Sequence, residues 1–363
     1  MSTATNTAAN ELLASQNIGL LRRITRIQAA QVVLVLLAIV IVFSVMAPDQ
    51  FLTVFNIRSI ITNTAIFAVL GIGATMVIIT AGIDLSVGAV LVFSSVVSAQ
   101  VMGNMGAEGW TTALVGTVVA IVAGAAWGLL NGFLIAVAKV PAFIVTLGTM
   151  GAAVGLSQVL TGGIDLATVP SVLVDTVGFG NAFWEVPTLV VISAILVVIG
   201  SIVLHRTRFG LMVFAIGSNP EACRRVGIKV DRNLIAVYTI AGICAGIGGI
   251  LSLAFYQQTT IGGQSMTALT VIAGVVIGGT SLFGGIGSIF GTVIGLLIPV
   301  VLQAGFIIIG VQSYWQGVVV GMFLIAAVYF DGLRRSRATR GSGRKPKHLQ
   351  VGGVKVGATS EKG

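Results

Sequence analysis

Residues 64–99, TAIFAVLGIGATMVIITAGIDLSVGAVLVFSSVVSA, form two apolar runs that are joined by the short segment 81–84. Asp84 is the only charged residue in this stretch. Apolar runs of about 18 residues or more are typical of helices that cross a membrane. The stretch therefore predicts two transmembrane helices with a break between them, and backbone without helical hydrogen bonds at membrane depth has to be buried inside the protein.

The composition of the whole chain extends this prediction to most of its length. Of the 363 residues, 56% are hydrophobic and 9% are charged, and the mean hydropathy is +1.06. Soluble domains have about 45–50% apolar and about 25% charged residues. These values exclude a soluble enzyme, a secreted disulfide scaffold and a disordered protein. We therefore expect an all-α, polytopic membrane protein.

Apolar runs predict about ten transmembrane helices along the chain. They cover residues 31–47, 57–80, 85–102, 112–137, 142–160, 187–204, 234–256, 266–282, 283–302 and 313–330. The second and third spans, and the eighth and ninth, nearly abut, which favours broken helices at both places. We expect a disordered cytoplasmic tail at 1–30, one transmembrane domain at 31–332, and a basic, disordered cytoplasmic tail at 333–363.

The basic residues predict how these spans are oriented. If the N-terminus is cytoplasmic, all 20 Lys and Arg residues except Arg58 fall on the inner side, as the positive-inside rule requires. Both termini are then cytoplasmic, the acidic loop 161–186 is external and the loop 205–233 is internal. The net charge of +9 needs no nucleic-acid partner, and the basic tail is expected near anionic lipid headgroups.

Glycines recur at four-residue spacing in several of the predicted spans. They are Gly124, Gly128 and Gly132, Gly242 and Gly246, Gly274 and Gly278, Gly291 and Gly295, and Gly317 and Gly321. This spacing places small residues on one helix face and permits close helix packing. It favours packing within the chain, with a subunit interface as the alternative.

The sequence lacks the groups that catalysis in such a chain would need. No G-x-x-x-x-G-K-[ST] phosphate-binding loop is present, so this device for holding ATP is missing. Asp84 is the only carboxylate among the apolar spans, whereas an aspartyl catalytic pair needs two. We expect no catalytic residue, no metal site and no enzymatic activity in this chain.

Asp84 has two compatible interpretations and a third that is more demanding. A charge in hydrocarbon is costly and normally faces the bundle interior or a water-filled path. Asp84, with help from Ser86, could cap the third span by accepting hydrogen bonds from N–H groups at its start. It could equally line a substrate path. Proton coupling is the third interpretation, which would require a perturbed pKa and a relay partner.

The internal loop 205–233 contains a predicted short helix at residues 220–226. Asn219 suits the N-cap position, Pro220 the first helical position and Glu221 the positive end of the helix dipole. Gly227 is a natural residue for the position after the helix end. A two-turn charged helix held between spans is a good docking element, although an ordinary connecting loop is the alternative.

Three motifs in this order carry a resemblance to a known family. They are GIDLSVG at 82–88, GSNPEACRRVGI at 217–228 and VIGGTSLFGGIGS at 276–288. The chain resembles, over residues 31–332, the inner-membrane permease subunit of ribose-type sugar ABC importers, a branch that includes xylose, arabinose, galactose and autoinducer-2 permeases. Alanine is commoner in that family where Cys223 stands.

The resemblance implies a fold, partners and residue roles. It implies a bundle of the type II importer kind with broken helices, in the bacterial plasma membrane, that passes ribose or a related pentose. The implied partners are a second copy of the chain, a cytoplasmic ATPase that binds ATP and Mg, and an external sugar-binding protein that Asp165 and Asp175 would meet. The implied ATPase-coupling residues are Asn219, Pro220, Glu221, Ala222, Arg224, Arg225 and Gly227. Candidates that line the path are Thr80, Asp84, Ser86, Asn131, Thr280 and Ser281.

Two other classes of function remain open. The first is a proton- or sodium-coupled secondary transporter in which Asp84 is the coupling site. The second is a scaffold protein in the membrane whose helix near residues 219–227 binds a partner other than an ATPase.

Overall fold

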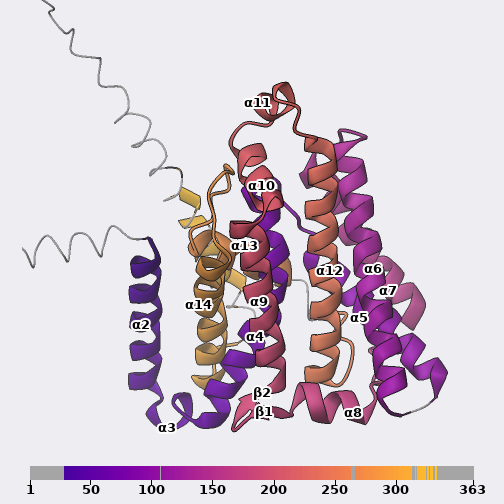
Figure 1. Cartoon of the computed structure of the whole chain (residues 1–363). Helices are drawn as coiled ribbons and strands as arrows, with labels where there is room; N and C mark the ends of the chain where they lie inside the picture. The colour runs from indigo at the N-terminus through magenta and orange to yellow at the C-terminus, as the bar shows by residue number, and fades with distance from the viewer. Residues whose placement is uncertain are drawn as a thin grey trace, which may run out of the picture.

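The computed structural model describes residues 28–106, 108–262, 266–312 and part of 315–332. The chain forms a bundle of long helices that run up and down between two ends (Figure 1). The described residues include seven helices that are long and apolar enough to cross a membrane. The expected fold class, an all-α polytopic membrane protein, is confirmed. Most of both predicted tails, at 1–27 and 333–363, lies outside the described residues.

The elements follow one another with short connections. The first half contains α2 (Gln28–Met46), α3 (Pro48–Phe51), α4 (Val54–Ile79), α5 (Val87–Met105), α6 (Trp110–Ala136) and α7 (Ala142–Thr161). The second half contains α8 (Ser171–Leu173), the π-helical turn η1 (Val174–Gly178), β1 (Asn181–Phe183), β2 (Val186–Pro187), α9 (Thr188–Arg206), α10 (Arg208–Ser218), α11 (Pro220–Arg225), α12 (Val230–Tyr256), α13 (Thr267–Ile277) and α14 (Ile289–Ile308). β1 and β2 pair antiparallel as a small hairpin.

Two of the expected boundaries need correction, and the position of a third predicted span is described only in part. The eighth span, predicted at 266–282, is the helix α13 of only 11 residues. Such a helix rises about 16 Å, roughly half of a bilayer core. The loop predicted at 205–233 holds the additional helix α10, because an apolar run continues beyond Thr207. The tenth span, at 313–330, lies only in part within the described residues.

Glycine contacts bring α6 and α12 unusually close together. A Cβ atom on Gly124 would lie 2.2 Å from the carbonyl oxygen of Gly242, and one on Gly128 would lie 2.3 Å from that of Tyr238. α13 and α14 approach in the same way, since a Cβ on Gly278 would lie 2.2 Å from the carbonyl oxygen of Gly291. The glycine spacing thus serves packing within the chain at these places. Gly321 has nothing within 4 Å of such an atom.

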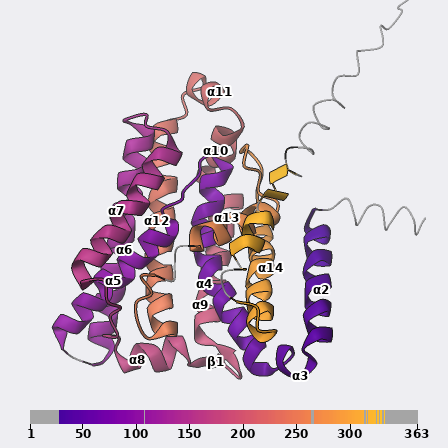
Figure 2. The same ribbon diagram turned by 180° about the vertical axis from the view of Figure 1, so that it is seen from behind.

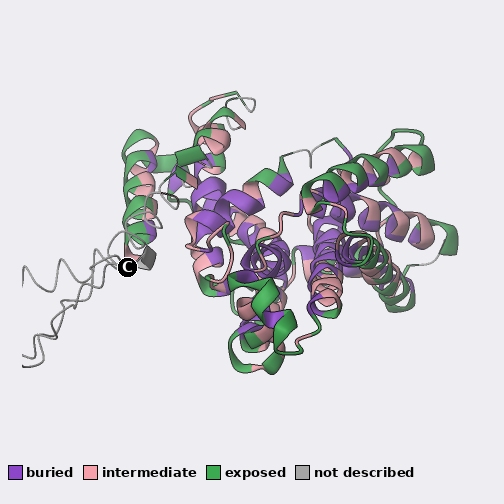
Figure 3. Cartoon of the chain, turned by 90° about the horizontal axis from the view of Figure 1, so that it is seen from above, coloured by how far each residue is buried: buried purple, intermediate pink, exposed green. Residues whose placement is uncertain are grey.

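The apolar core has two parts. The larger part lies among α4, α5, α12 and α13, and includes the fully buried Leu70, Leu91 and Leu253. A smaller cluster joins α2 and α3 to α14, with Phe43 stacked on Phe51 at a ring distance of 5.5 Å. Seen from above, buried residues occupy the middle of the bundle and exposed residues its rim (Figure 3). The large apolar side chains on this rim suit contact with lipid.

The two ends of the bundle differ in their elements and charge. α10 and α11 lie at one end, and α3, α8 and the hairpin lie at the other (Figure 2). The turn between α6 and α7, with Lys139, lies at the α11 end, whereas Arg58 bonds to Phe179 and Asn181 near the hairpin. This separation agrees with the charge pattern of the sequence. Which end is cytoplasmic stays a prediction.

We expect Gly124→Val to destabilise the protein, because a branched side chain there would collide with the backbone of α12. Overpacking of this kind costs about 1–3 kcal/mol. The matched control is Ala126→Val, which adds the same side chain on the exposed face of α6. Thermal unfolding of both variants in detergent checks the prediction, and equal melting temperatures would contradict it.

Candidate functional site

The three sequence motifs meet at the α11 end of the bundle. The N–H of Gly285 donates a hydrogen bond of 2.8 Å to the carbonyl oxygen of Ile79. A Cβ atom on Gly217 would lie 1.7 Å from that same oxygen, so the end of α10 can approach only because residue 217 is a glycine. The break at 80–86, the end of α10 and the segment 278–288 therefore form one junction.

Asp84 is the centre of a buried hydrogen-bonded cluster. Its Oδ1 atom accepts bonds from the backbone N–H of Ser86 at 2.8 Å and from the Ser86 hydroxyl at 2.6 Å. The side-chain amide of Asn131, on α6, donates to the Ser86 oxygen at 2.9 Å. All three side chains are buried. The cluster ties the helix break to the middle of the bundle.

The expected capping role of Asp84 needs a correction. Ser86 itself occupies the N-cap position of α5, and its side chain makes no capping bond. Asp84 bonds to the N–H of that residue and not to the N–H groups of the first turn. The carboxylate therefore closes the turn that precedes the helix.

The backbone at this break is strained. Ala81 has a φ angle of 61°, in the left-handed region that costs an L-residue roughly 1–2 kcal/mol. The N–H of Gly82 donates a hydrogen bond of 3.1 Å to the carbonyl oxygen of Val77, and this bond closes the end of α4. Thr80 also bonds back to Val77, so its hydroxyl belongs to the end of α4 and not to the Asp84 cluster.

Tyr238 is a neighbour of the cluster that the sequence analysis missed. A Cβ atom on Gly82 would lie 2.6 Å from the Tyr238 hydroxyl, so Tyr238 on α12 lies against the break. No motif contains this residue, and its position in an apolar run gave no indication of a polar role. Glycine at position 82 is needed to leave room for the hydroxyl.

Three buried polar atoms in this region have no hydrogen-bond partner among the described residues. They are Asn131 Oδ1, the Tyr238 hydroxyl and Thr280 Oγ1. An unsatisfied buried polar atom costs about 1–3 kcal/mol.

Thr280 and Ser281 lie in the tight turn between α13 and α14. The N–H of Ser281 donates to the carbonyl oxygen of Ile286 at 3.0 Å, and the Ser281 hydroxyl accepts from the N–H of Phe283 at 3.3 Å. Ile79 contacts this turn beside Gly287, where an added Cβ would lie 2.8 Å from Thr280 Cγ2. The structure thus brings Asp84, Ser86 and Asn131 into one cluster, with Thr280 across the junction.

The short helix predicted near residue 220 is confirmed as α11. The Asn219 side chain accepts from the N–H of Ala222 at 2.9 Å, and Pro220 is the first helical residue. Gly227 follows the helix with a φ angle of 83°. α11 lies beyond the ends of the long helices (Figure 1). Its charged face is therefore open to a partner.

α11 rests on the bundle through a small apolar contact. Cys223 is buried against Ile216 of α10 and Val230 of α12. Cys223 therefore serves as a small apolar residue between α11 and the bundle.

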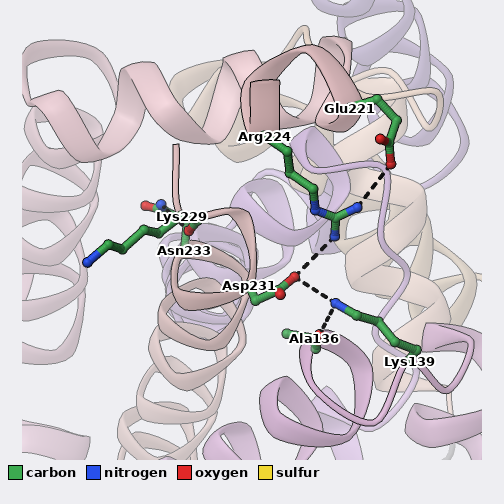
Figure 4. Close-up of polar contacts among 7 residues, drawn as sticks. All are labelled: Ala136, Lys139, Glu221, Arg224, Lys229, Asp231 and Asn233. Atoms are coloured by element: carbon green, nitrogen blue, oxygen red, sulfur yellow. Dashed lines mark hydrogen bonds and ion pairs between the residues drawn. The ribbon is translucent and has the colours of Figure 1, made fainter. Parts of the chain in front are cut away.

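A chain of charged side chains connects α11 to two other elements (Figure 4). The Arg224 guanidinium lies 3.0 Å from Glu221 Oε1 and 3.1 Å from Asp231 Oδ1. The Lys139 ammonium lies 2.7 Å from the same Asp231 oxygen. The hydrogen bond with Asp231 raises the pKa of the Arg224 guanidinium, which keeps it charged. Arg225, also predicted for coupling, lies outside this network and is exposed.

The two acidic residues expected at the opposite end differ in their surroundings. The Asp165 carboxylate accepts from the Thr259 hydroxyl and the N–H of Ile261, both at 2.9 Å, and so holds the loop after α12. Asp175 is exposed on η1. Among the described residues, no group of three or more His, Cys, Asp or Glu side chains could hold a metal ion.

We expect Asp84→Ala to destabilise the protein and Asp84→Asn to leave it nearly unchanged. Alanine would leave the buried N–H of Ser86 without its acceptor, at a cost of about 1–3 kcal/mol, whereas the asparagine oxygen can accept the same two bonds. Thermal unfolding in detergent measures both variants. Equal loss of stability in both would show that the negative charge, and not the hydrogen bonds, maintains the break.

The sequence of this chain is similar to those of known permease proteins. A family model described as "Branched-chain amino acid transport system / permease component" matches residues 56–328. The ribose import permease protein of Escherichia coli strain K12 is 36% identical over 302 residues, which cover 83% of this chain and 92% of that protein. No solved structure matches the chain.

Two further relatives have similar extents of match. The D-allose transport system permease protein of Escherichia coli strain K12 is 36% identical over 301 residues, covering 82% of this chain and 90% of that protein. The fructose import permease protein of Rhizobium meliloti is 36% identical over 312 residues, covering 84% and 85%. The resemblance found in the three motifs is confirmed by these matches.

Proposed function

The chain belongs to the family of branched-chain amino acid transport system permease components, and from this premise we propose that it is the membrane subunit of a bacterial ABC importer for a monosaccharide. Members of this family are transport subunits and not enzymes. We place ATP and Mg on a separate ATPase chain, since the present sequence has no phosphate-binding loop.

The observation that carries this proposal is α11. It is a capped helix that projects from one end of the bundle and presents Glu221, Arg224 and Arg225 to the surroundings. A rigid charged helix at this position suits a cleft in a cytoplasmic subunit. The coupling residues in our proposal are Asn219, Pro220, Glu221, Ala222, Arg224, Arg225 and Gly227.

The proposed mechanism is alternating access. ATP binding would close the ATPase dimer and displace α11, and the displacement would change the packing of the helices around the path. The free energy comes from the difference in ATP affinity between the two states. The end of α10 touches the break at Ile79 directly, so a movement of this segment would reach Asp84 through backbone contacts.

The proposed path is weakly polar. Asp84, Ser86 and Asn131 form its best-defined polar group, and Thr80, Thr280 and Ser281 are further candidates. The unpaired Asn131 oxygen and Thr280 hydroxyl could pair with sugar hydroxyl groups. A path with few charges suits a neutral solute, because strong binding sites inside it would slow release.

The substrate class rests on the relatives. They include import permeases for ribose, for galactose or methyl galactoside and for fructose, and a transport system permease for D-allose. We propose a monosaccharide and place ribose first, with related pentoses and hexoses next. The selection would be made mainly by an external sugar-binding protein, which could contact the exposed Asp175.

The assembly we propose contains two copies of this chain in the bacterial inner membrane, with both termini cytoplasmic. Its transmembrane domain covers residues 31–332, and the tails 1–30 and 333–363 flank it. The seven apolar helices support the multi-pass arrangement. The position of α11 at the end that carries Lys139 supports a cytoplasmic location for that end.

We expect Glu221→Lys and Arg225→Glu to abolish transport without affecting membrane insertion, because both reverse a charge on the docking face of α11. The tagged chain is purified in mild detergent, and its partners are identified by mass spectrometry. Recovery of an ATPase with the unaltered chain, and its loss from both variants, would support the proposal. Normal docking and uptake in both variants would contradict the role of α11.

Uptake into proteoliposomes that contain the complex then tests the solute. Ribose, allose, galactose, fructose and leucine are compared, since the family description names branched-chain amino acids whereas the relatives import sugars. ATP-dependent uptake of leucine alone would overturn the sugar assignment.

The alternative is a proton- or sodium-coupled secondary transporter with Asp84 as the coupling site. Under the importer proposal we expect Asp84→Asn to impair uptake by its effect on the path, and an uncoupler to leave ATP-driven uptake unchanged. Collapse of uptake by the uncoupler, together with no requirement for ATP, would favour the alternative. Uptake is measured in the same proteoliposomes.

A further inference from the structure

We propose that Asp231 is a positioning residue that clamps α11 to the turn between α6 and α7, so that α11, α6 and α12 move as one body. This inference rests on the proposed role of α11 as the docking helix. It adds two residues outside the 217–228 motif, Asp231 and Lys139, to the elements that transmit its movement.

The geometry that points to a clamp is the sharing of one oxygen atom. Asp231 Oδ1 accepts both from Lys139 Nζ at 2.7 Å and from Arg224 Nη2 at 3.1 Å. The three residues come from the first turn of α12, the α6–α7 turn and α11 (Figure 4). One carboxylate therefore joins α11 and the neighbouring start of α12 to the α6–α7 turn, which lies 92 residues earlier in the sequence.

Lys139 is held in place for this contact. Its φ angle is 59°, a left-handed conformation that an L-residue adopts only when its surroundings enforce it. Its ammonium group also donates to the carbonyl oxygen of Ala136, at the end of α6. The ammonium group of Lys139 thus contacts both the end of α6 and Asp231, and it joins the end of α6 to α12.

α11 needs such a clamp because little else holds it. It has six residues, and within the described part of the chain its apolar packing on the bundle is limited to the small cluster around Cys223. Gly227 follows it directly, and a glycine with positive φ is a point at which the chain can turn. A force on α11 could therefore tilt the helix on this cluster instead of moving the bundle.

Two helices, α6 and α12, connect the clamp to the buried polar cluster around Asp84. α6 carries Asn131, whose amide donates to Ser86 beside Asp84. α12 carries Tyr238, whose hydroxyl lies against Gly82. The backbones of α6 and α12 are in direct contact at Gly124 and Gly242. Because this contact is closely packed, a displacement of one helix would move the other. Movement that reaches Asp231 would therefore reach both sides of the Asp84 break.

The individual ion pairs are exposed, and this determines what the clamp can do. The side chains of Lys139 and Asp231 are 57% and 47% exposed, so each contact contributes little to global stability. The expected effect is on the orientation of α11 and on coupling, with the thermal stability of the chain nearly unchanged.

The variants are Asp231→Asn, which is nearly isosteric and removes the charge that attracts both cations, Lys139→Gln, and the two together. The matched control is Lys229→Gln, a charge removal two residues from Asp231. The Lys229 side chain points away from the network in Figure 4. Membrane insertion and melting temperature are checked for all four proteins.

The first measurement is the number of solute molecules transported per ATP hydrolysed, in proteoliposomes with the complete complex. We expect Asp231→Asn to lower this ratio roughly three- to tenfold. This is the combined effect expected from the loss of two exposed ion pairs, those with Arg224 and Lys139. Lys139→Gln should lower it less, and should add little in the Asp231→Asn background because the pair is already broken. Asp231→Glu should restore much of the ratio.

The second measurement needs no partner and no solute. Amide hydrogen exchange of the purified full chain is compared over residues 219–230. Faster exchange there in Asp231→Asn, with Lys229→Gln equal to the unaltered chain, is the expected result. Unchanged exchange in Asp231→Asn would overturn the clamp even if the importer proposal holds.

The two proposals fail in different ways. If the unaltered complex shows no ATP-driven uptake, the proposed function fails, and the exchange experiment still decides whether Asp231 holds α11. If uptake is coupled in the unaltered complex and Asp231→Asn transports with the same ratio, the clamp has no role in transmission. Equal loss in Lys229→Gln would show a general effect of charge and would also overturn the inference.

Discussion

The hydrogen bond from Gly285 to the carbonyl oxygen of Ile79 is the contact on which the arrangement of this bundle depends. Buried backbone that leaves a helix has to find hydrogen-bond partners within the protein. Here two interrupted helices meet and satisfy part of each other's backbone. Gly217 completes the junction because the absence of a side chain lets α10 approach the same oxygen.

Asp84 adds a buried, hydrogen-bonded polar group to this junction. The carboxylate accepts two bonds from Ser86, and Asn131 secures the serine from the side of α6. The same region keeps several buried polar atoms without partners among the described residues. A fully paired network would favour one closed arrangement, whereas an incompletely paired one leaves polar groups that are available when the helices separate.

Much of this could be predicted from local sequence patterns. Length and apolarity predicted most long helices, and capping chemistry predicted α11, because Asn219, Pro220 and Gly227 each act on their own neighbours. Contacts between distant segments were beyond such reasoning. Tyr238 reaches the break because α12 packs closely on α4, and Asp231 meets Lys139 across two separate turns. The length of α13 was overestimated, since apolar residues continue into a turn that glycines bend.

The close backbone contact between α6 and α12 also bears on how the protein is made. The two helices are separated along the chain by α7 to α11, so α6 is synthesised well before its partner. Until then its glycine face lies against lipid or other helices, without the backbone surface that fits it. Insertion and packing are separate stages in membrane proteins, and side-by-side assembly can follow later. This close helix contact is therefore completed only after α12 enters the membrane.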